Sequence, residues 1–455
     1  MPNTRTSGLC ASRTGRHASV WHVHFMHEAS SITCLASGLL VSEVKIIGSW
    51  SPENWSNDDT SNIDVIMCFF GRSIDKSLLL SFVHHKESLF EFSLFLMMLH
   101  ESAILFGFEE DKCDLFNGRW VPDFKGSGYT ISSCATIPTS KNCFRNGRKD
   151  KDFLNWRWKP DKCDLPRFDP KAYLNIVRGR TLAFIGDSVA RNHMESLLCL
   201  LSQEEVPIDA YKDSEDRNRI WYFPGHDFTL KILWTKFLVL GEERVINGSS
   251  SGIFDLYLDK VDENWARDLQ SLDYAIVSDA HWFFRQIYLH KGSDVVACVY
   301  CNEENVTDRG INFALRMAFR AALSHVNHCH KCKGIVTLLR TFSPSHFENG
   351  FWNTGGTCNR TSPFNGQEIN FGVSEREIRS LQVEEIERAR KTGKKGKKFG
   401  VLDVTMAMLM RPDGHPGAYW GNKWMKGYND CVHWCLPGPI DVWNDLLLAV
   451  LRMLD

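Results

Sequence analysis

The chain has 455 residues, enough for two or three domains, and 43% of them are hydrophobic, as in an ordinary globular protein. Its formal net charge of −2 argues against a nucleic acid or an anionic membrane surface as partner. Fifteen tryptophans in a nearly neutral chain suit carbohydrate binding as well as they suit core packing.

Residues 1–107 show no clear periodicity or motif. Met1–Ser30 lacks the apolar core of a signal peptide. The most apolar stretch, Leu78–Phe108, is interrupted by charged residues and histidines, and its uninterrupted run Phe92–Leu99 is too short to span a bilayer. We expect residues 1–107 to be a divergent leader, with a weak membrane anchor as the alternative.

Cysteine usage points to an oxidising compartment. Three cysteines (Cys10, Cys34 and Cys68) precede residue 100, and an even number, twelve, follow from Cys113 onward. An even, widely spread set favours disulfides. Three sequons in the same region agree with the secretory pathway; they begin at Asn247, Asn305 and Asn359.

A zinc site is the alternative use of four of these cysteines. Cys298-x-x-Cys301 and Cys329-x-x-Cys332 have ligand-like spacing within each pair, but the two pairs are further apart than in the usual two-knuckle site. Disulfides are therefore favoured, and no metal is predicted.

Residues 108–166 form a distinct Cys-rich segment. It has many turn residues, little helical periodicity and four cysteines, namely Cys113, Cys134, Cys143 and Cys163. The pattern predicts a small, loop-rich module stapled by disulfides. The pair Trp156 and Trp158 packs against the next domain or, alternatively, offers a platform for sugars.

Residues 167–455 alternate strand-like and helical patterns. The strand-like runs are Thr181–Ile185, Leu230–Leu240, Tyr274–Ser278, Ile335–Leu339 and Val401–Val404. The helical patterns are Val189–Leu201, Ile311–His325, Ser374–Arg390 and Ile440–Leu454. This alternation predicts an α/β domain with a mostly parallel sheet flanked by helices, whose active edge lies at the carboxyl ends of the strands.

Ser188 stands at one of those ends. Gly186-Asp187 breaks the strand-like run, and helical spacing follows at once. Backbone N–H groups at a helix start can hold the oxyanion that forms when a serine attacks an ester. The alternative is that Ser188 is only the N-cap of the helix.

A partner for this serine lies near the C-terminus. Asp430 and His433 are three residues apart, which on a turn brings both side chains to one side, so the carboxylate can orient the imidazole toward Ser188. A zinc or structural cluster of Cys431, His433 and Cys435 is the alternative. Rival bases are His226, His281 and His415. The combination is the plan of a Ser-His-Asp esterase in the lipase group known for its Gly-Asp-Ser motif.

With these motifs the chain resembles the plant trichome birefringence-like family of polysaccharide O-acetyltransferases over residues 111–454. The segment from Cys113 to Cys163 looks like the family's Cys-rich N-terminal domain, and Gly186-Asp187-Ser188 and Asp430-x-x-His433 match its two signatures. Residues 158–169, 186–201 and 339–364 look most like the branch associated with xyloglucan and mannan acetylation.

The resemblance implies a GDSL/SGNH-like (PC-esterase) fold and an enzyme of the Golgi lumen, usually associated with the membrane. Such an enzyme moves acetyl from a donor, such as acetyl-CoA, through an acetyl-serine onto hydroxyls of a cell-wall polysaccharide, with no bound cofactor. Ser188 would be the nucleophile, His433 the base and Asp430 its orienting acid. Arg191 and Asn192 would support the oxyanion site.

The chain departs from the family at one block. Asp279-Ala280-His281-Trp282 replaces the usual Gly-His/Gln-Trp, so Ala280 and His281 would take the oxyanion-side positions if the backbone accepts a Cβ there. The motifs alone leave two alternatives open, a polysaccharide acetylesterase with the same triad and a non-catalytic protein that binds wall glycans.

Overall fold

The computed structural model describes residues 113–332, 334–364, 373–393, 396–421 and 427–454, together with four short strands nearer the N-terminus. Contacts divide the chain into two units, Met1–His100 and Glu101–Asp455. In the first unit, β1 (Ser31–Ile32) pairs with β4 (Val44–Lys45), and β2 (Leu35–Ala36) pairs with β3 (Leu39–Leu40).

The expected leader or anchor in residues 1–107 otherwise lies outside the described residues. In the part of the chain that the structure describes, no helix is both long and apolar enough to cross a bilayer.

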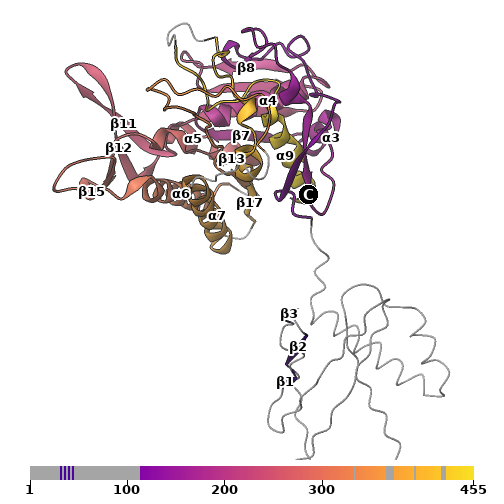
Figure 1. Ribbon diagram of the computed structural model, residues 1–455. Helices are drawn as coiled ribbons and strands as arrows, with labels where there is room; N and C mark the ends of the chain where they lie inside the picture. Colours follow the sequence, from indigo (N-terminus) through magenta and orange to yellow (C-terminus); the bar gives the residue numbers. More distant parts are fainter. Residues whose placement is uncertain are drawn as a thin grey trace, which may run out of the picture. The chain divides into compact units, whose positions relative to one another are not determined.

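The second unit is built around a seven-stranded sheet with the order β17-β16-β13-β7-β10-β9-β8 (Figure 1). Its five-strand parallel part consists of β7 (Thr181–Gly186), β10 (Phe228–Trp234), β13 (Tyr274–Ser278), β16 (Val336–Arg340) and β17 (Lys398–Leu402). The edge strands β8 (Ile208–Lys212) and β9 (Arg219–Phe223) are antiparallel. The predicted α/β class with a mostly parallel sheet is confirmed.

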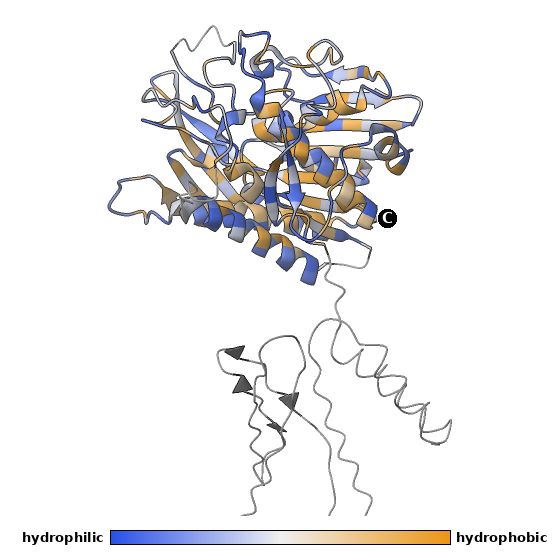
Figure 2. Cartoon of the chain, turned by 45° about the vertical axis from the view of Figure 1, so that its right-hand side comes forward, coloured by the Kyte–Doolittle hydropathy of each residue, from blue (hydrophilic) through white to orange (hydrophobic). Residues whose placement is uncertain are grey.

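Helices cover both faces of this sheet. Alternate residues of β7 enter different cores, since Leu182 and Phe184 pack with one set of helices and Ala183 and Ile185 with the other. The first set comprises α3 (Pro170–Ile176), α4 (Ser188–Leu201) and α9 (Val442–Leu454). The second comprises α5 (Glu263–Ala266), α6 (Gly310–His328) and α7 (Val373–Lys391). Figure 2 shows hydrophobic residues concentrated along the strands between them.

A second sheet was not predicted from the sequence. It has the order β11-β12-β14-β15, formed by β11 (Val239–Ile246), β12 (Ser249–Val261), β14 (Ile287–Lys291) and β15 (Asp294–Val299). The predicted single strand Leu230–Leu240 is wrong, because β10 ends at Trp234 and Leu238 turns the chain with a φ of 62°. Phe237 and Leu238 are buried in that turn, so hydropathy gives no sign of the break.

The Cys-rich segment packs onto the catalytic domain through its two strands. β5 (Gly118–Pro122) pairs antiparallel with β6 (Trp156–Pro160), and η1 (Thr139–Lys141) and η2 (Asp152–Leu154) lie between them in the chain. Trp120 donates from Nε1 to the carbonyl oxygen of Ala407 in α8 (Thr405–Leu409) at 2.7 Å. Trp158 is 2% exposed, so for this residue the packing interpretation is confirmed.

The twelve cysteines from Cys113 onward form six disulfides. They are Cys113–Cys163, Cys134–Cys199, Cys143–Cys435, Cys298–Cys301, Cys329–Cys332 and Cys358–Cys431. The Cys-rich segment is therefore not stapled only to itself, since two of its four cysteines tie it to the catalytic domain. The zinc alternatives are wrong for these cysteines, because each of them is bonded to another cysteine.

Candidate active site

The nucleophile turn depends on a glycine. Gly186 ends β7 with a φ of 152°, and a Cβ at this position would lie 1.7 Å from the carbonyl oxygen of Ser278. Asp187 follows as the N-cap of α4, and its Oδ1 accepts from the N–H groups of Val189 at 2.9 Å and Ala190 at 3.3 Å. Ser188 is thus the first residue of the helix, and its alternative role as the N-cap is wrong.

The structure brings the three predicted catalytic residues together. His433 Nε2 lies 2.8 Å from Ser188 Oγ, and His433 Nδ1 lies 2.9 Å from Asp430 Oδ2. A proton on Nδ1 is held by the carboxylate, which leaves Nε2 as the acceptor for the serine proton. Residues 245 positions apart in the sequence therefore form one hydrogen-bonded chain.

Asp430 is held as a carboxylate. Burial alone would raise its pKa, but the charges of His433 and Lys141 and the hydrogen bonds from His433 hold the pKa well below the ordinary value. Asp430 Oδ1 accepts from the backbone N–H groups of Val432 at 3.2 Å and His433 at 3.0 Å. The carboxylate is therefore fixed in place as well as ionised.

Lys141 is a contributor that sequence reasoning missed. It comes from η1 of the Cys-rich segment, is 8% exposed, and its Nζ lies 3.6 Å from Asp430 Oδ2. The nearby Cys143–Cys435 disulfide and a 2.9 Å hydrogen bond from Leu436 N to Lys141 O attach η1 to the loop that carries His433. The only sequence signal was the position of Lys141 two residues before a cysteine.

Of the four residues predicted to support the oxyanion, Asn192 and Arg191 lie on α4 and have other partners. The side chain of Asn192 is committed to Trp434, since its Oδ1 accepts from Trp434 N at 2.7 Å and its Nδ2 donates to Trp434 O at 3.3 Å. Arg191 pairs with Glu195 at 2.9 Å and with Asp216 at 3.1 Å. These contacts show Asn192 fixing the residue after His433 and Arg191 bridging two carboxylates.

Ala280 and His281 lie at the carboxyl end of β13, the strand next to β7. Ala280 has a φ of −178°, which lies outside the positive-φ region that favours glycine, so its φ does not require a glycine here. His281 Nε2 donates to the carbonyl oxygen of Ser343 at 3.0 Å. Burial lowers the pKa of His281 to about 4, so this imidazole is neutral at pH 7.

Two buried carboxyl groups, those of Asp187 and Asp279, lie next to the turn that carries Ser188. Asp187 and Asp279 are 1% and 3% exposed, and burial together with the charge of Asp187 raises the pKa of Asp279 well above the ordinary value. Arg340, 3% exposed, is the nearby cation and donates from its Nη2 to Ser278 Oγ at 2.8 Å. The Asp279 carboxyl is therefore harder to ionise than an ordinary aspartate.

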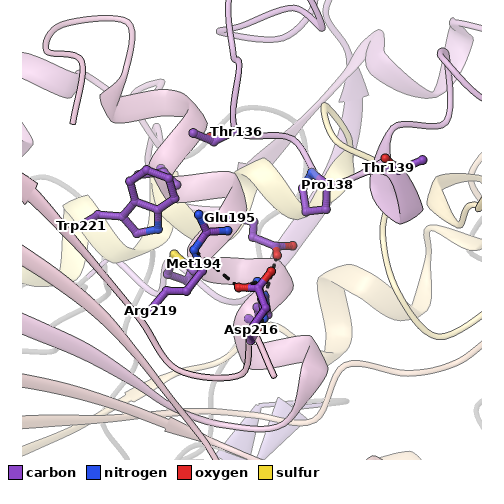
Figure 3. A pocket seen from close by; sticks show the side chains of 10 residues that line it. Thr136, Pro138, Thr139, Met194, Glu195, Asp216, Arg219 and Trp221 are labelled. Carbon is purple, nitrogen blue, oxygen red and sulfur yellow. Dashed lines mark hydrogen bonds and ion pairs between the residues drawn. The ribbon is translucent and has the colours of Figure 1, made fainter. Parts of the chain in front are cut away.

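A pocket of about 280 Å³ lies along α4 beside the triad loop (Figure 3). Its walls come from the Cys-rich segment, α4 and the region before β10; they include Thr136, Thr139, Arg191, Glu195, Asp216, Arg219 and Trp221. Figure 3 shows the Asp216 carboxylate close to the Arg219 side chain in this pocket. The lining does not include Ser188, Asp430 or His433, although Arg191 and Glu195 come from the helix that begins with Ser188.

The rival histidines have other partners. His226 Nδ1 lies 2.5 Å from Glu205 Oε2. His415 donates from Nδ1 to the carbonyl oxygen of His433 at 2.7 Å, so it supports the triad loop. Only His433 reaches Ser188 among the histidines that the structure describes.

Comparison with known proteins gives two family matches. The "PMR5 N terminal Domain" matches residues 111–164, and the "GDSL/SGNH-like Acyl-Esterase family found in Pmr5 and Cas1p" matches residues 165–450. Xyloglucan O-acetyltransferase 4 of Populus trichocarpa is 86% identical over 76% of this chain and 83% of its own length.

Two relatives from Arabidopsis thaliana agree. Xyloglucan O-acetyltransferase 2 is 62% identical over 76% of this chain and 84% of its own length. Protein trichome birefringence-like 19 is 44% identical over 75% of this chain and 81% of its own length. The chain therefore belongs to the GDSL/SGNH-like acyl-esterase family found in Pmr5 and Cas1p, and within it to the trichome birefringence-like proteins.

Proposed function

We propose that this protein is a polysaccharide O-acetyltransferase that acetylates hydroxyls of a plant hemicellulose, with xyloglucan as the acceptor. The observation that carries the reaction type is the 2.8 Å contact between Ser188 Oγ and His433 Nε2, with Asp430 on the opposite ring nitrogen. The named activity of the relatives, at 86% and 62% identity, supports transfer to xyloglucan.

In the first step His433 Nε2 takes the proton of Ser188 as Oγ attacks the acetyl carbonyl of the donor. Asp430 stabilises the imidazolium that forms. Collapse of the tetrahedral intermediate breaks the bond to the donor's leaving group, which takes the proton from His433. The product is an acetyl-serine at position 188.

In the second step a sugar hydroxyl takes the place of the leaving group. His433 removes its proton, the sugar oxygen attacks the acetyl carbon, and Ser188 Oγ leaves and regains the proton. Water in the same position would give free acetate, so transfer depends on binding the acceptor and excluding water.

The oxyanion of both intermediates needs N–H donors. Those of Val189 and Ala190 already donate to Asp187 Oδ1. We therefore assign this role to the backbone N–H groups of Ser188 and Ala280, at the ends of two adjacent parallel strands. Of the N–H groups expected to hold the oxyanion at the helix start, this assignment keeps that of Ser188, together with the expected one of Ala280.

We also propose that the enzyme works in the lumen of the Golgi apparatus, associated with the Golgi membrane, with an acetyl donor such as acetyl-CoA and no bound cofactor. Six disulfides support an oxidising compartment.

The test is acetyl transfer to xyloglucan oligosaccharides by the full chain, read by mass spectrometry of both sugar and protein. Ser188→Ala should lose the acetyl-enzyme and the acetylated sugar. Ser202→Ala, at the far end of the same helix, is the matched control and should retain both. Free acetate with no acetylated sugar, even at high acceptor concentration, would establish the acetylesterase instead.

A further inference from the structure

A series of contacts leads from the triad to a neighbouring surface. Trp434, directly after His433, donates from Nε1 to Ser343 Oγ at 2.9 Å. The carbonyl oxygen of Ser343 accepts from His281 at 3.0 Å. His281 begins η4 (His281–Phe283), and Phe284, which follows η4, is exposed.

Trp282, Phe284 and Arg285 follow His281 in the chain, and the Arg285 guanidinium also contacts Trp352, whose neighbour is Phe351. The guanidinium carbon of Arg285 lies 4.5 Å from the ring centre of Trp282 and 5.8 Å from that of Trp352. The outer members are open to solvent, with Phe284 41%, Trp352 47% and Phe351 72% exposed. We call these five residues the aromatic strip.

The N–H groups of the Arg285 side chain have no hydrogen-bond acceptor among the described residues. Its Nε is buried without a hydrogen-bond partner, and among the described residues the side chain makes cation–π contacts but no hydrogen bond or ion pair. Burial lowers its pKa, with the charge of Glu243 acting in the opposite direction. Nη1 and Nη2 are not buried in this way, so a ligand that brings hydroxyl oxygens to the aromatic surface can accept hydrogen bonds from them.

Sugars can contact both the aromatic rings and the guanidinium of the strip. The C–H face of a pyranose covers an aromatic ring, and its hydroxyl oxygens accept from a guanidinium. A phosphate-bearing ligand would need a surplus of cations. The second cation on Trp282, Lys236 at 4.8 Å, already has Glu243 at 3.9 Å, which limits that surplus.

We propose that the aromatic strip binds neutral sugar residues of the acceptor polysaccharide, on the side of the triad where η4 begins. This assignment rests on the proposed function, which supplies the polysaccharide. It adds the surface that holds the chain, with Trp352 as the stacking side chain and Arg285 as the hydroxyl donor.

The test measures binding rather than turnover. The full chain carrying Ser188→Ala is titrated calorimetrically with a soluble xyloglucan oligosaccharide and, separately, with coenzyme A. Adding Trp352→Ala or Arg285→Gln should weaken binding of the oligosaccharide about tenfold and leave that of coenzyme A unchanged. Phe124→Ala, an aromatic that is 84% exposed in the Cys-rich segment, is the control and should change neither.

The outcomes separate the two proposals. Unchanged oligosaccharide binding in both strip variants, or no binding by the parent, overturns the strip as an acceptor site. Weaker binding of coenzyme A alone assigns it to the donor. Strip-dependent binding in an enzyme that transfers no acetyl to the same oligosaccharide overturns the proposed function and leaves the strip as a glycan site.

Discussion

Three side chains define the reaction, and the role of Asp430 is the easiest of the three to isolate. Both of its oxygens contact His433 Nδ1, at 2.9 and 3.0 Å, and no proton is available on this low-pKa carboxylate at neutral pH. The ring is therefore held with hydrogen on Nδ1 and a free lone pair on Nε2.

Asp430→Asn keeps the shape of this side chain but favours the other tautomer of His433. The amide NH₂ can donate to Nδ1, which leaves the proton on Nε2 and deprives Ser188 of its acceptor. We expect kcat for acetyl transfer to fall by about 10³ to 10⁴. The measurement is steady-state kinetics with matched near-UV circular dichroism. A fall below tenfold would show that Asp430 does not set the tautomer, and Asp294→Asn, at an exposed position, is the control.

At the scale of elements, η1 of the Cys-rich segment is part of the active site through Lys141. The charged and titratable groups near the ammonium and the catalytic pair are Asp430, Glu195, His433, His415 and His281. Lys141 favours the ionised carboxylate and disfavours a second positive charge on the imidazole.

Lys141→Met should therefore move the acidic limb of the kcat/KM profile to higher pH, by about one pH unit, because the catalytic pair loses the cation that lies 3.6 Å from the carboxylate. Lys141→Arg should restore the limb. Lys149→Met removes an exposed lysine of the same segment and should leave the profile unchanged. A uniform loss of activity with no displacement of the limb would assign Lys141 a packing role only.

The same elements show what the sequence could predict. The strand, the glycine break and the helix around Ser188 are contiguous, so hydrophobic periodicity located β7 and α4 closely. Asp430 and His433 were found because their spacing is local. The Cys143–Cys435 bond joins residues 292 apart, and no local pattern reports a pairing of that kind. Lys141 was missed for the same reason, since it contacts Asp430 only after the segment has packed.

At the scale of the whole molecule, two buried acids at the start of the C-terminal helix contact segments far away in the sequence, and one of them, Asp441, contacts the Cys-rich segment. Asp441 accepts from the hydroxyl of Tyr129 at 2.9 Å, and Asp445 accepts from the backbone N–H of Phe168 at 2.8 Å. Burial raises the pKa of Asp441 to about 6 and that of Asp445 to about 7. The folded state thus binds protons that the unfolded chain has already released.

This raised pKa fixes the sign of one pH effect on stability. Below the unfolded value of 3.8 the contribution of Asp445 is fully present, and it is lost as pH rises toward about 7. Buried histidines such as His281 and His346, whose pKa values are lowered to about 4, act in the opposite direction below pH 6.5. The contribution of Asp445 to the pH dependence of stability must therefore be measured as the difference in unfolding free energy between the parent and a variant.

Asp445→Asn keeps an acceptor for Phe168 N and removes the ionisation. Its free energy of unfolding, relative to the parent, should rise from pH 4 to pH 7 by up to about 1.4 kcal/mol per pH unit and then level off, because the parent must bury a charge that the amide lacks. Urea denaturation at several pH values, with disulfides intact, measures this difference. Asp294→Asn is the exposed control and should give a flat difference. A flat difference for Asp445→Asn as well would mean that this acid titrates alike in the folded and unfolded chain, so that its burial is relieved in solution.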